Sequence, residues 1–242
     1  MVDCKFLIAG DCAVVMDFGN EISPQINNRV KGMFDLLLKH PIKGIVEIVP
    51  TFRSLMIYYD PYKISYSALT KKLSKRLNSL SSSASSSKRI FKIPVCYGGV
   101  YGEDLADVAE HTHLSQEEVI KRHHSTDYLI YMLGFLPGFP YLGGMDPSIV
   151  TPRLKNPRTK IPSGSVGIGG EQTGIYPLAS PGGWRLIGKT PVFLYDPNRE
   201  QPVLYRVGDY IRFVPISEEE YSEIEWLVKN NVYEFDIEEV NG

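Results

Sequence analysis

The sequence predicts an α+β protein of two domains, a small N-terminal α+β domain followed by a C-terminal domain built mostly of short β-strands. Three observations lead to this prediction. The first 80 residues alternate strand-like and helix-like segments, seven of the nine residues 79–87 are serine, and short apolar segments separated by turn residues recur from Val166 onward. The alternation is typical of a small layered fold, and many short strands at regular spacing indicate a barrel or sandwich.

The predicted strands of the N-terminal domain, residues 1–80, come in two pairs. Residues 5–8 and 12–18 are apolar segments on either side of a short turn. Residues 44–50 (GIVEIVP) and 54–60 (SLMIYYD) are rich in β-branched and aromatic side chains, which favour strands.

Two predicted helices complete this domain. Ser23 fits an N-cap position with Pro24 in the first helical turn, and the helix is expected to continue to about Lys39. The second helix is marked by leucines at helical spacing. The apolar positions that define the two buried faces are Ile26, Val30, Met33 and Leu37 in the first helix and Leu69, Leu73, Leu77 and Leu80 in the second.

A serine-rich linker, residues 81–88, is expected to separate the domains, because a run of serines cannot bury apolar surface. A phosphorylated regulatory tract is a less favoured alternative. The C-terminal domain, residues 89–230, then begins with a strand, RIFKIPVCYGG. Ser115 and Glu118 form a predicted capping box for a helix that ends near His124, and the strand YLIYMLGF follows it.

The second half of this domain reads as a series of short strands from Val166 onward, namely VGIGG, GIYPL, WRLIG, VFLYD, VLYRV and YIRFV. Turn residues separate them, as in a closed or nearly closed barrel or a sandwich. Ser217 and Glu220 predict a capping box for a final helix to about Lys229. The acidic tail, residues 231–242, is expected to be loosely held.

Composition excludes several classes of protein. The 242 residues have 43% apolar and 22% charged content, which is ordinary for a soluble globular chain. Cys4, Cys12 and Cys96 have no disulfide-framework or zinc-finger spacing, so a reducing cytoplasm and no metal are expected. No segment has the features of a signal peptide or the length of a membrane span. A pI near 6.2 without a basic run argues against nucleic-acid binding.

Residues 134–191 stand out from the rest of the chain. They hold 12 of the 21 glycines and 9 of the 17 prolines, and their net charge is +4 whereas the whole chain carries −2. Alternating glycine and proline predicts rigid, irregular loops. A basic loop region on an acidic protein indicates a site for a carboxylate, a phosphate or an acidic partner. Ordinary loops with solvated lysines and arginines are the alternative.

The sequence GWRLIGKT, residues 183–190, matches the phosphate-binding pattern G-x-x-x-x-G-K-[ST]. We interpret the match as accidental. A P-loop needs a helix that begins at the Lys-Ser/Thr pair, whereas Pro191 disfavours helical backbone at Thr190. The bulky residues between the two glycines predict a strand, and so does VFLY after them.

Several candidate site residues also have a plainer structural explanation. His123 and His124 end the predicted helix, where a cation is favoured by the helix dipole, so capping is preferred over a metal site. Glu171 is either a general base or an ion-pair partner. Hydroxyl groups in the stretch can bind an anion or cap turns, and its aromatic rings can line a pocket or pack in the core. These residues are Ser163, Ser165, Thr173 and Ser180 and, among the aromatics, Phe135, Phe139, Tyr141 and Trp184.

Two long motifs, GFLPGFPYLGG (134–144) and PRTKIPSGSVGIGGEQTGIYPLASPGGWRLIGKTP (157–191), strongly resemble the family of KipI and the 5-oxoprolinase B subunit. This family is related to allophanate hydrolase subunit 1 and to carboxyltransferase domain subdomains C and D. The motifs IPVCYGG (93–99) and GDCAVVMDFG (10–19) extend the resemblance to nearly the entire chain. The resemblance implies a small N-terminal α+β domain and a C-terminal cyclophilin-like β-barrel.

The resemblance implies two main functions and a less favoured third. The favoured one is the B subunit of a multi-subunit 5-oxoprolinase, in which the complex uses ATP to open 5-oxo-L-proline to L-glutamate. Its partners would be a larger, KipA-like subunit and a LamB/YcsF-like subunit. The alternative is inhibition of the autophosphorylation of a sensor histidine kinase, and a subunit of allophanate hydrolase or a carboxyltransferase is less favoured.

For the enzyme, activation of the amide builds negative charge that cations on rigid loops can stabilise. The expected catalytic residues are Lys155, Arg158, Lys160, Glu171 and Arg185. The expected substrate-binding residues are Phe139, Tyr141, Ser163, Thr173, Ser180 and Trp184. A partner protein is expected to complete the site, because the chain shows no convincing nucleophile or nucleotide motif.

Overall fold

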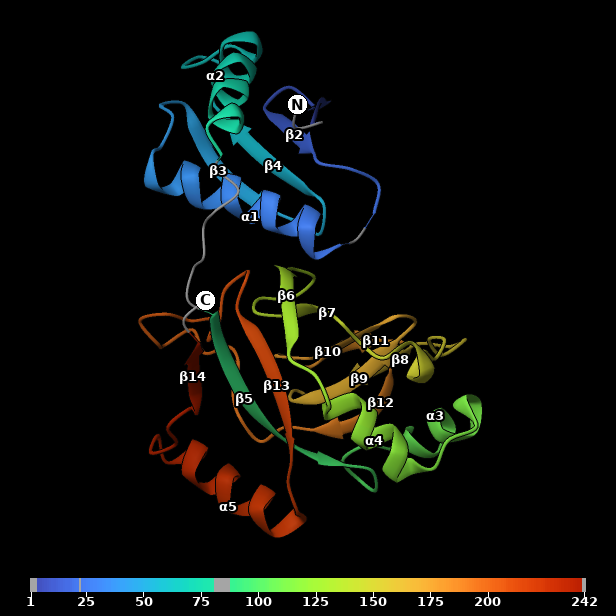
Figure 1. The fold of residues 1–242 in the computed structure, drawn as a ribbon. Coiled ribbons are helices and arrows are strands. Elements are labelled where there is room, and N and C mark those ends of the chain that lie inside the picture. Colours follow the sequence, from blue (N-terminus) through green and yellow to red (C-terminus); the bar gives the residue numbers. More distant parts are fainter. Residues whose placement is uncertain (1–3, 22, 81–87, 241–242) are drawn as a thin grey trace. The chain divides into compact units, whose positions relative to one another are not determined.

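The chain divides into two units, Met1–Ser86 and Ser87–Gly242 (Figure 1). Each unit has its own hydrophobic core. The computed structural model describes residues 4–21, 23–80 and 88–240. The predicted linker, residues 81–88, therefore lies outside the described residues except for Lys88.

The N-terminal unit is a four-stranded antiparallel sheet with two helices on one face. In spatial order the strands are β1 (Lys5–Ala9), β2 (Ala13–Asp17), β4 (Ser54–Tyr59) and β3 (Ile45–Pro50). The helices are α1 (Pro24–Lys39) and α2 (Tyr66–Asn78). Their predicted apolar faces are buried against the sheet, with Val30, Met33, Leu37, Leu69, Leu73 and Leu77 among the core residues. The Oγ of Ser23 accepts the N–H of Ile26, which confirms the predicted N-cap of α1.

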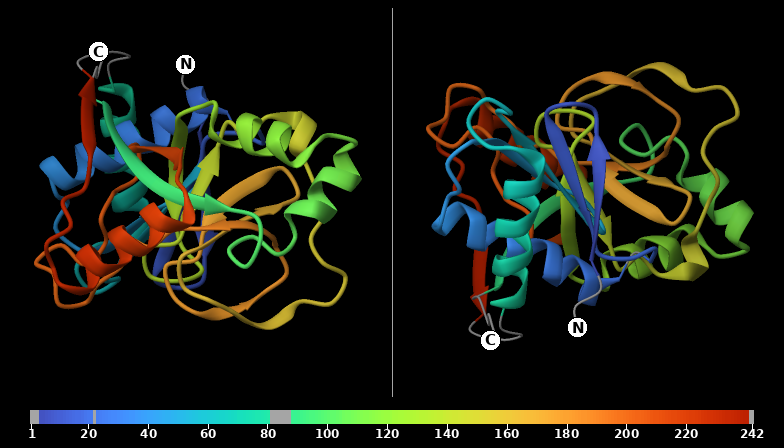
Figure 2. Two further views of the ribbon diagram at one scale, coloured as in Figure 1. Left: turned by 90° about the horizontal axis from the view of Figure 1, so that it is seen from below. Right: turned by 90° about the horizontal axis from the view of Figure 1, so that it is seen from above.

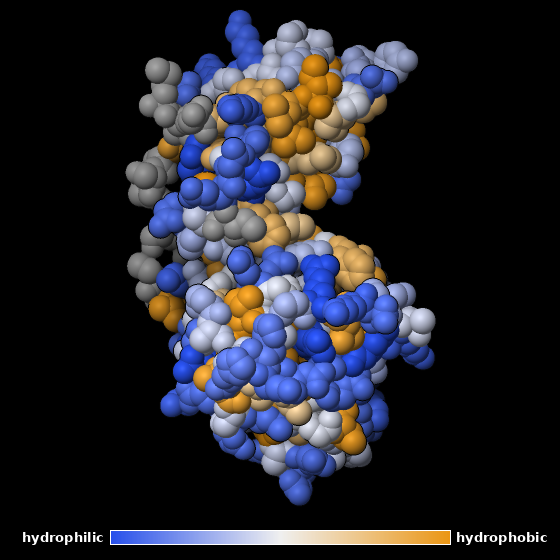
Figure 3. Space-filling view, turned by 90° about the vertical axis from the view of Figure 1, so that its right-hand side faces the viewer, coloured by the Kyte–Doolittle hydropathy of each residue, from blue (hydrophilic) through white to orange (hydrophobic). Residues whose placement is uncertain are grey.

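The other face of this sheet carries a row of apolar side chains. Cross-strand pairing aligns Leu7, Val15, Met56 and Val49 in one row across all four strands. None of the four belongs to the core under the helices, and Leu7 is 46% exposed. Figure 3 shows apolar side chains gathered on the N-terminal unit.

The second unit is a β-barrel of seven strands, in agreement with the predicted closed barrel (Figure 2). β12 pairs with β9 on one side and with β5 on the other, which closes the ring. All neighbours are antiparallel except β5 and β13, which run parallel. In ring order the strands are β12 (Arg185–Lys189), β9 (Ser165–Gly169), β10 (Gln172–Ile175), β7 (Pro140–Gly143), β6 (Tyr128–Leu133), β13 (Tyr210–Pro215) and β5 (Lys88–Tyr97).

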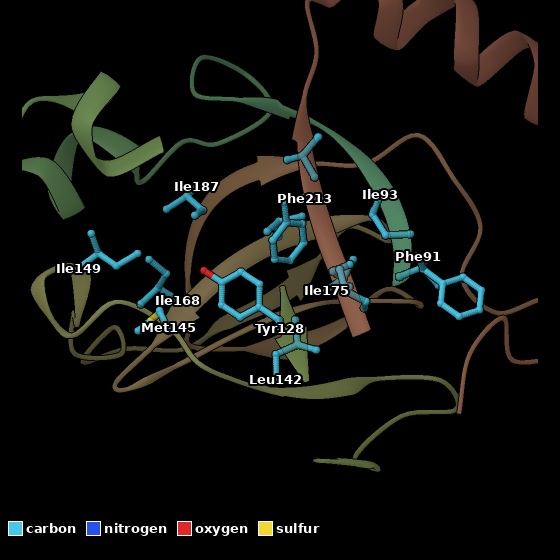
Figure 4. Packing of buried hydrophobic residues seen from close by; sticks show 14 of the residues in the cluster. Phe91, Ile93, Tyr128, Leu142, Met145, Ile149, Ile168, Ile175, Ile187 and Phe213 are labelled. Carbon is cyan, nitrogen blue, oxygen red and sulfur yellow. The ribbon is translucent and has the colours of Figure 1, made fainter. Parts of the chain in front are cut away.

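Large apolar side chains fill the core of this unit (Figure 4). Tyr128 and Phe213 lie there in edge-to-face contact, with ring centroids 5.4 Å apart. Two predicted strands, VFLYD and VLYRV, are wrong. Their buried side chains, Leu194 and Tyr205 among them, help to fill the core, but their backbones form only an isolated bridge at Tyr195.

Several further elements surround the barrel. Two helices, α4 (Gln116–His124) and α5 (Glu218–Lys229), match the predicted ones, and α5 has the complete capping box. Not predicted were α3 (Leu105–Thr112), the 3-10 turn η1 (Pro147–Ile149) and the strand pair β8 (Arg158–Ile161) and β11 (Ser180–Gly182).

The expectation of a loosely held tail needs correction. β14 (Ile237–Val240) pairs antiparallel with β5, where Ile237 lies opposite Phe91. Arg212 adds ion pairs to Glu238 at 2.9 Å and to Asp127 at 2.6 Å, so the acidic side chains of the tail are used to fix it.

Barrel closure should depend on Gly188. A Cβ at this position would lie 2.7 Å from Cγ1 of Val95 and 2.9 Å from the carbonyl oxygen of Cys96, so β12 and β5 would have to separate. We expect Gly188→Ala to lower the free energy of unfolding by about 1–3 kcal/mol in urea titrations. Gly183→Ala is the matched control, because the nearest atom to its Cβ is 3.6 Å away. Equal stability of the two variants would contradict this account.

Candidate functional site

The segment that matches the P-loop pattern forms strand β12. Arg185–Lys189 pair with β9 and β5, and Thr190 and Pro191 follow without a helix. The prediction of a strand is therefore confirmed here, and the segment lacks the helix N-terminus on which a P-loop holds phosphate.

The aromatic residues of the glycine-rich stretch pack against one another. Phe139 is the centre of this group: its ring lies edge-to-face with those of Tyr141, Tyr176 and Trp184, with centroids 5.2, 5.3 and 5.5 Å apart. Phe139, Tyr176 and Trp184 are buried, whereas Tyr141 is partly exposed. Phe139 and Trp184 therefore pack in the core, which was the alternative to lining a pocket.

Gly169 shows why this packing needs glycine. A Cβ on Gly169 would overlap Nε1 of Trp184, so the indole can lie against β9 only because no side chain is present. Sequence composition indicated a site for a carboxylate, a phosphate or an acidic partner in this glycine-rich stretch. At this position the group that approaches is a ring of the protein itself.

Arg158 is held by two carboxylates that precede α3. Its Nη2 donates to Oδ1 of Asp104 at 2.8 Å, and its Nε lies 3.0 Å from Oε1 of Glu103. Asp104 is 5% exposed, and its Oδ2 accepts the backbone N–H of Leu186 at 2.6 Å. The hydrogen bond to Asp104 raises the pKa of Arg158 above its ordinary value. Asp104 therefore fastens both Arg158 and strand β12 to the start of α3.

Arg185 has a similar partner. Its Nη1 donates to Oδ2 of Asp107 at 2.7 Å. Both predicted catalytic arginines are thus paired with acids from residues 103–107. Sequence pattern did not identify these acids, and no motif marks them.

Exposed cations lie along residues 151–160. Lys155 and Lys160 have exposed side chains, and no ion pair to either is found within the described ranges 4–21, 23–80 and 88–240. The guanidinium of Arg153 lies over the ring of Trp184, 5.8 Å from its centroid. These groups, with the partly exposed Tyr141, form what we call the candidate surface.

Glu171 belongs to the same part of the molecule. Gly170 donates its N–H to the carbonyl of Thr151 at 2.8 Å, and Leu154 donates to Gly183 at 2.7 Å. These bonds fasten one end of residues 151–154 to the β9–β10 turn and the other end to Gly183. The β9–β10 turn carries Glu171, whose side chain is exposed. Among the described residues, no cluster of three His, Cys, Asp or Glu side chains could hold a metal ion.

The predicted hydroxyl groups are satisfied by nearby protein oxygens. Ser163 donates to the carbonyl of Pro177 at 2.8 Å, and Ser180 donates to that of Pro181 at 3.2 Å. Thr173 is fully buried and donates to the carbonyl of Gly167 at 3.1 Å. Thr173 is thus enclosed in the protein, away from the candidate surface.

Thr173 ends a chain of hydrogen bonds through His123. Since its hydroxyl donates to Gly167, it accepts from Nε2 of His123, 2.7 Å away. Nδ1 of His123 must then accept from the hydroxyl of Tyr97, at 2.8 Å. Burial raises the pKa of Tyr97 well above its ordinary value, which keeps this donor protonated.

The role expected for His123, a cation at the end of a helix, is wrong. The imidazole is fully buried and stacks on Phe213 with ring centroids 4.5 Å apart. Burial lowers its pKa from about 6.5 to about 3, so the ring is neutral at physiological pH. His123 therefore joins α4 to the core of the barrel unit as an uncharged group.

The chain thus combines an α+β unit with a closed barrel that carries exposed cations on a glycine-rich segment. The family described as carboxyltransferase domain, subdomain C and D, matches residues 4–205, and the chain belongs to it. Within the described residues, the structure has no helix that is long and apolar enough to cross a membrane.

Similar proteins cover nearly the whole chain. The B subunit of 5-oxoprolinase from Bacillus subtilis is 44% identical over 222 residues, which are 88% of this chain and 92% of that protein. The protein of the same name from Escherichia coli O157:H7 is 41% identical, over 90% of this chain and 99% of that protein. The crystal structure of the Kluyveromyces lactis urea amidolyase matches 98% of this chain with a TM-score of 0.80 at 25% identity, and the chain spans 16% of its length.

Because folded His123 is neutral, we expect the stability of the fold to depend on pH. Below about pH 6.5 the unfolded chain binds a proton at this residue and the folded chain does not, so stability falls as the pH falls from about 6.5 toward 3. One proton corresponds to about 1.4 kcal/mol per pH unit. Urea titrations between about pH 7.5 and pH 5 should show this extra slope in the wild type and not in His123→Gln. His124→Gln should keep it, and an equal slope for His123→Gln would refute the assignment.

Asp104 and Asp107 provide a second test. Asp104→Asn removes the charge from a buried group that holds Arg158 and Leu186, and we expect it to lower the free energy of unfolding by about 1–3 kcal/mol. Asp107→Asn removes a carboxylate that is 56% exposed, and we expect less than about 1 kcal/mol. Chemical denaturation of both variants measures the difference, and a larger loss for Asp107→Asn would contradict the buried role of Asp104.

Proposed function

We propose that this chain is the B subunit of a cytoplasmic, ATP-dependent 5-oxoprolinase. The complex would convert 5-oxo-L-proline, ATP and water to L-glutamate, ADP and phosphate. The observation that carries the proposal is the 44% and 41% identity to two proteins named as the B subunit of 5-oxoprolinase, across 92% and 99% of their lengths. Similarity over nearly the whole of both proteins includes the N-terminal unit as well as the barrel.

The candidate surface supports a role in binding an anion. Lys155 and Lys160 extend into solvent with no carboxylate partner among the described side chains, so their charges are available to a substrate carboxylate or to a phosphate group. Hydrogen bonds from such cations contribute about 1.5–3 kcal/mol each. Glu171 is exposed beside the same segment and is available as a base.

The other expected site residues take supporting roles in this proposal. Arg158 and Arg185 form ion pairs with Asp104 and Asp107. In this proposal they help to hold residues 151–160 in place and do not contact the substrate. Phe139 and Trp184 form the buried layer beneath the candidate surface, and the partly exposed ring of Tyr141 is available to the substrate. Ser163 follows strand β8, which carries Lys160, and Ser180 belongs to β11, which pairs with β8. Thr173 makes no direct contact with substrate in this proposal, because its side chain is enclosed in the protein.

ATP is proposed to bind to a partner protein of the complex or at an interface with one. The segment of this chain that matches a nucleotide motif is strand β12, so nothing in residues 183–190 cradles phosphate. The proposed partners are a larger, KipA-like subunit and a LamB/YcsF-like subunit. An open, cationic surface without a nucleotide motif fits one part of a shared site.

Reconstitution tests the proposal directly. The purified chain is mixed with both partner proteins and ATP, and glutamate release from 5-oxoproline is measured with each protein omitted in turn. We expect activity only when all three are present. Full activity without this chain would refute the proposal, and inhibition of a sensor histidine kinase would be the next activity to assay.

The two lysines should matter to catalysis rather than to folding. We expect Lys155→Gln and Lys160→Gln each to lower kcat/KM of the complex about 10-fold or more, which corresponds to the loss of a charged hydrogen bond. Thermal unfolding should be unchanged, because both side chains are exposed. Lys121→Gln, at an exposed lysine of α4, is the control. Normal turnover in both variants would remove these lysines from the site.

A further inference from the structure

Phe135 adopts a backbone conformation that is unusual for a bulky residue. Its φ is 66°, and the N–H of Leu136 donates to the carbonyl of Gly134 at 2.7 Å across it. This is a tight, strained γ-turn. The two other non-glycine residues with positive φ in the described part of the chain, His113 and Asn231, follow the ends of helices, where left-handed backbone is usual. Phe135 has no such explanation.

The loop that contains this turn is firmly held. Gly134 donates to the carbonyl of Phe139 at 3.2 Å, and Phe139 donates back to Leu136 at 3.0 Å. The buried hydroxyl of Tyr205 donates to the carbonyl of Gly138 at 2.8 Å. Strain of this kind persists only where the surroundings enforce it, and it is concentrated at functional positions. The strained turn is therefore a fixed feature of the barrel unit.

The turn directs an aromatic ring outward, against a buried ring that also contacts Tyr141 of the candidate surface. The side chain of Phe135 is 62% exposed. Its ring meets that of Phe139 edge-to-face, with centroids 5.6 Å apart, and Phe139 in turn contacts Trp184, over which Arg153 lies. Through the buried rings of Phe139 and Trp184, the exposed phenyl group is thus linked to the guanidinium of Arg153, one of the cations of the candidate surface.

We propose that Phe135 anchors the larger partner protein over the candidate surface, by inserting its ring into an apolar pocket of that protein. This inference rests on the proposed function. A ring that projects from a rigid turn suits a protein pocket, because it loses little conformational entropy on binding and aromatic side chains dominate interface energies.

The chemistry of the site requires such a cover. Lys155 and Lys160 are in water, where their interactions with an anion are screened. A docked partner excludes water and strengthens those interactions. Docking beside the cations also brings the ATP site of a partner to the substrate. Phe135 thereby couples binding of the partner to completion of the active site.

The test measures the dissociation constant between the purified chain and the larger partner protein by titration calorimetry. We expect Phe135→Ala and Phe135→Gly each to weaken binding by at least about 10-fold. Phe135→Gly should also leave the thermal unfolding midpoint unchanged or raised, because glycine adopts positive φ without strain. A residue needed only for folding would lower that midpoint. Trp226→Ala is the matched control, since Trp226 has the same exposed fraction, 62%, and lies on α5.

Each outcome decides a separate question. Weaker binding of both Phe135 variants with normal binding of Trp226→Ala supports the inference. If the wild type binds and is required for glutamate release but Phe135→Gly binds as tightly, the anchor is refuted and the proposed function stands. If Trp226→Ala alone weakens binding, the partner docks on α5 and the anchor is again refuted. No binding by the wild type overturns both proposals.

Discussion

Closure of the barrel through strand β12 is the constraint on which the rest of the second unit depends. Because β12 pairs with β9 and β5 at once, it holds residues near position 96 and residues near position 166 on its two sides. That closure lets Asp104 reach the backbone of Leu186 and lets His123 reach Thr173. The side chains of Asp104 and His123 are both buried, and their hydrogen bonds offset the free-energy cost of removing them from water.

The charges of the glycine-rich stretch divide into two groups with different roles. Arg158 and Arg185 are neutralised by acids of residues 103–107, which lie outside the stretch. Lys155 and Lys160 remain exposed on the same unit. The net charge of +4 therefore overstates the charge available to a ligand. The two arginines instead hold strands β8 and β12 to the acids of residues 103–107, and β8 also carries Lys160.

Local signals in the sequence were the most accurate. The first helix runs from Pro24 to Lys39 as predicted, because its N-cap and apolar spacing lie within the helix itself. The strands of the N-terminal unit and β9, β12 and β13 were also predicted, by runs of apolar residues. In contrast, the sequence did not predict α3, β8, β11 or β14. α3 is eight residues long and has no side-chain N-cap hydrogen bond. β8, β11 and β14 are short strands, and the register of their pairing is set by distant parts of the chain.

The sequence by itself determined the two-unit α+β architecture, the caps, and the place where cations and glycines are concentrated. Only the tertiary structure decided what those residues do. Arg158 meets Asp104 across 54 positions and His123 meets Thr173 across 50, separations at which no periodicity or motif relates one residue to the other. The strain at Phe135 was likewise invisible, because composition records a phenylalanine and only the folded backbone fixes its φ at 66°. Helix signals are local, whereas partners and strain are imposed by packing.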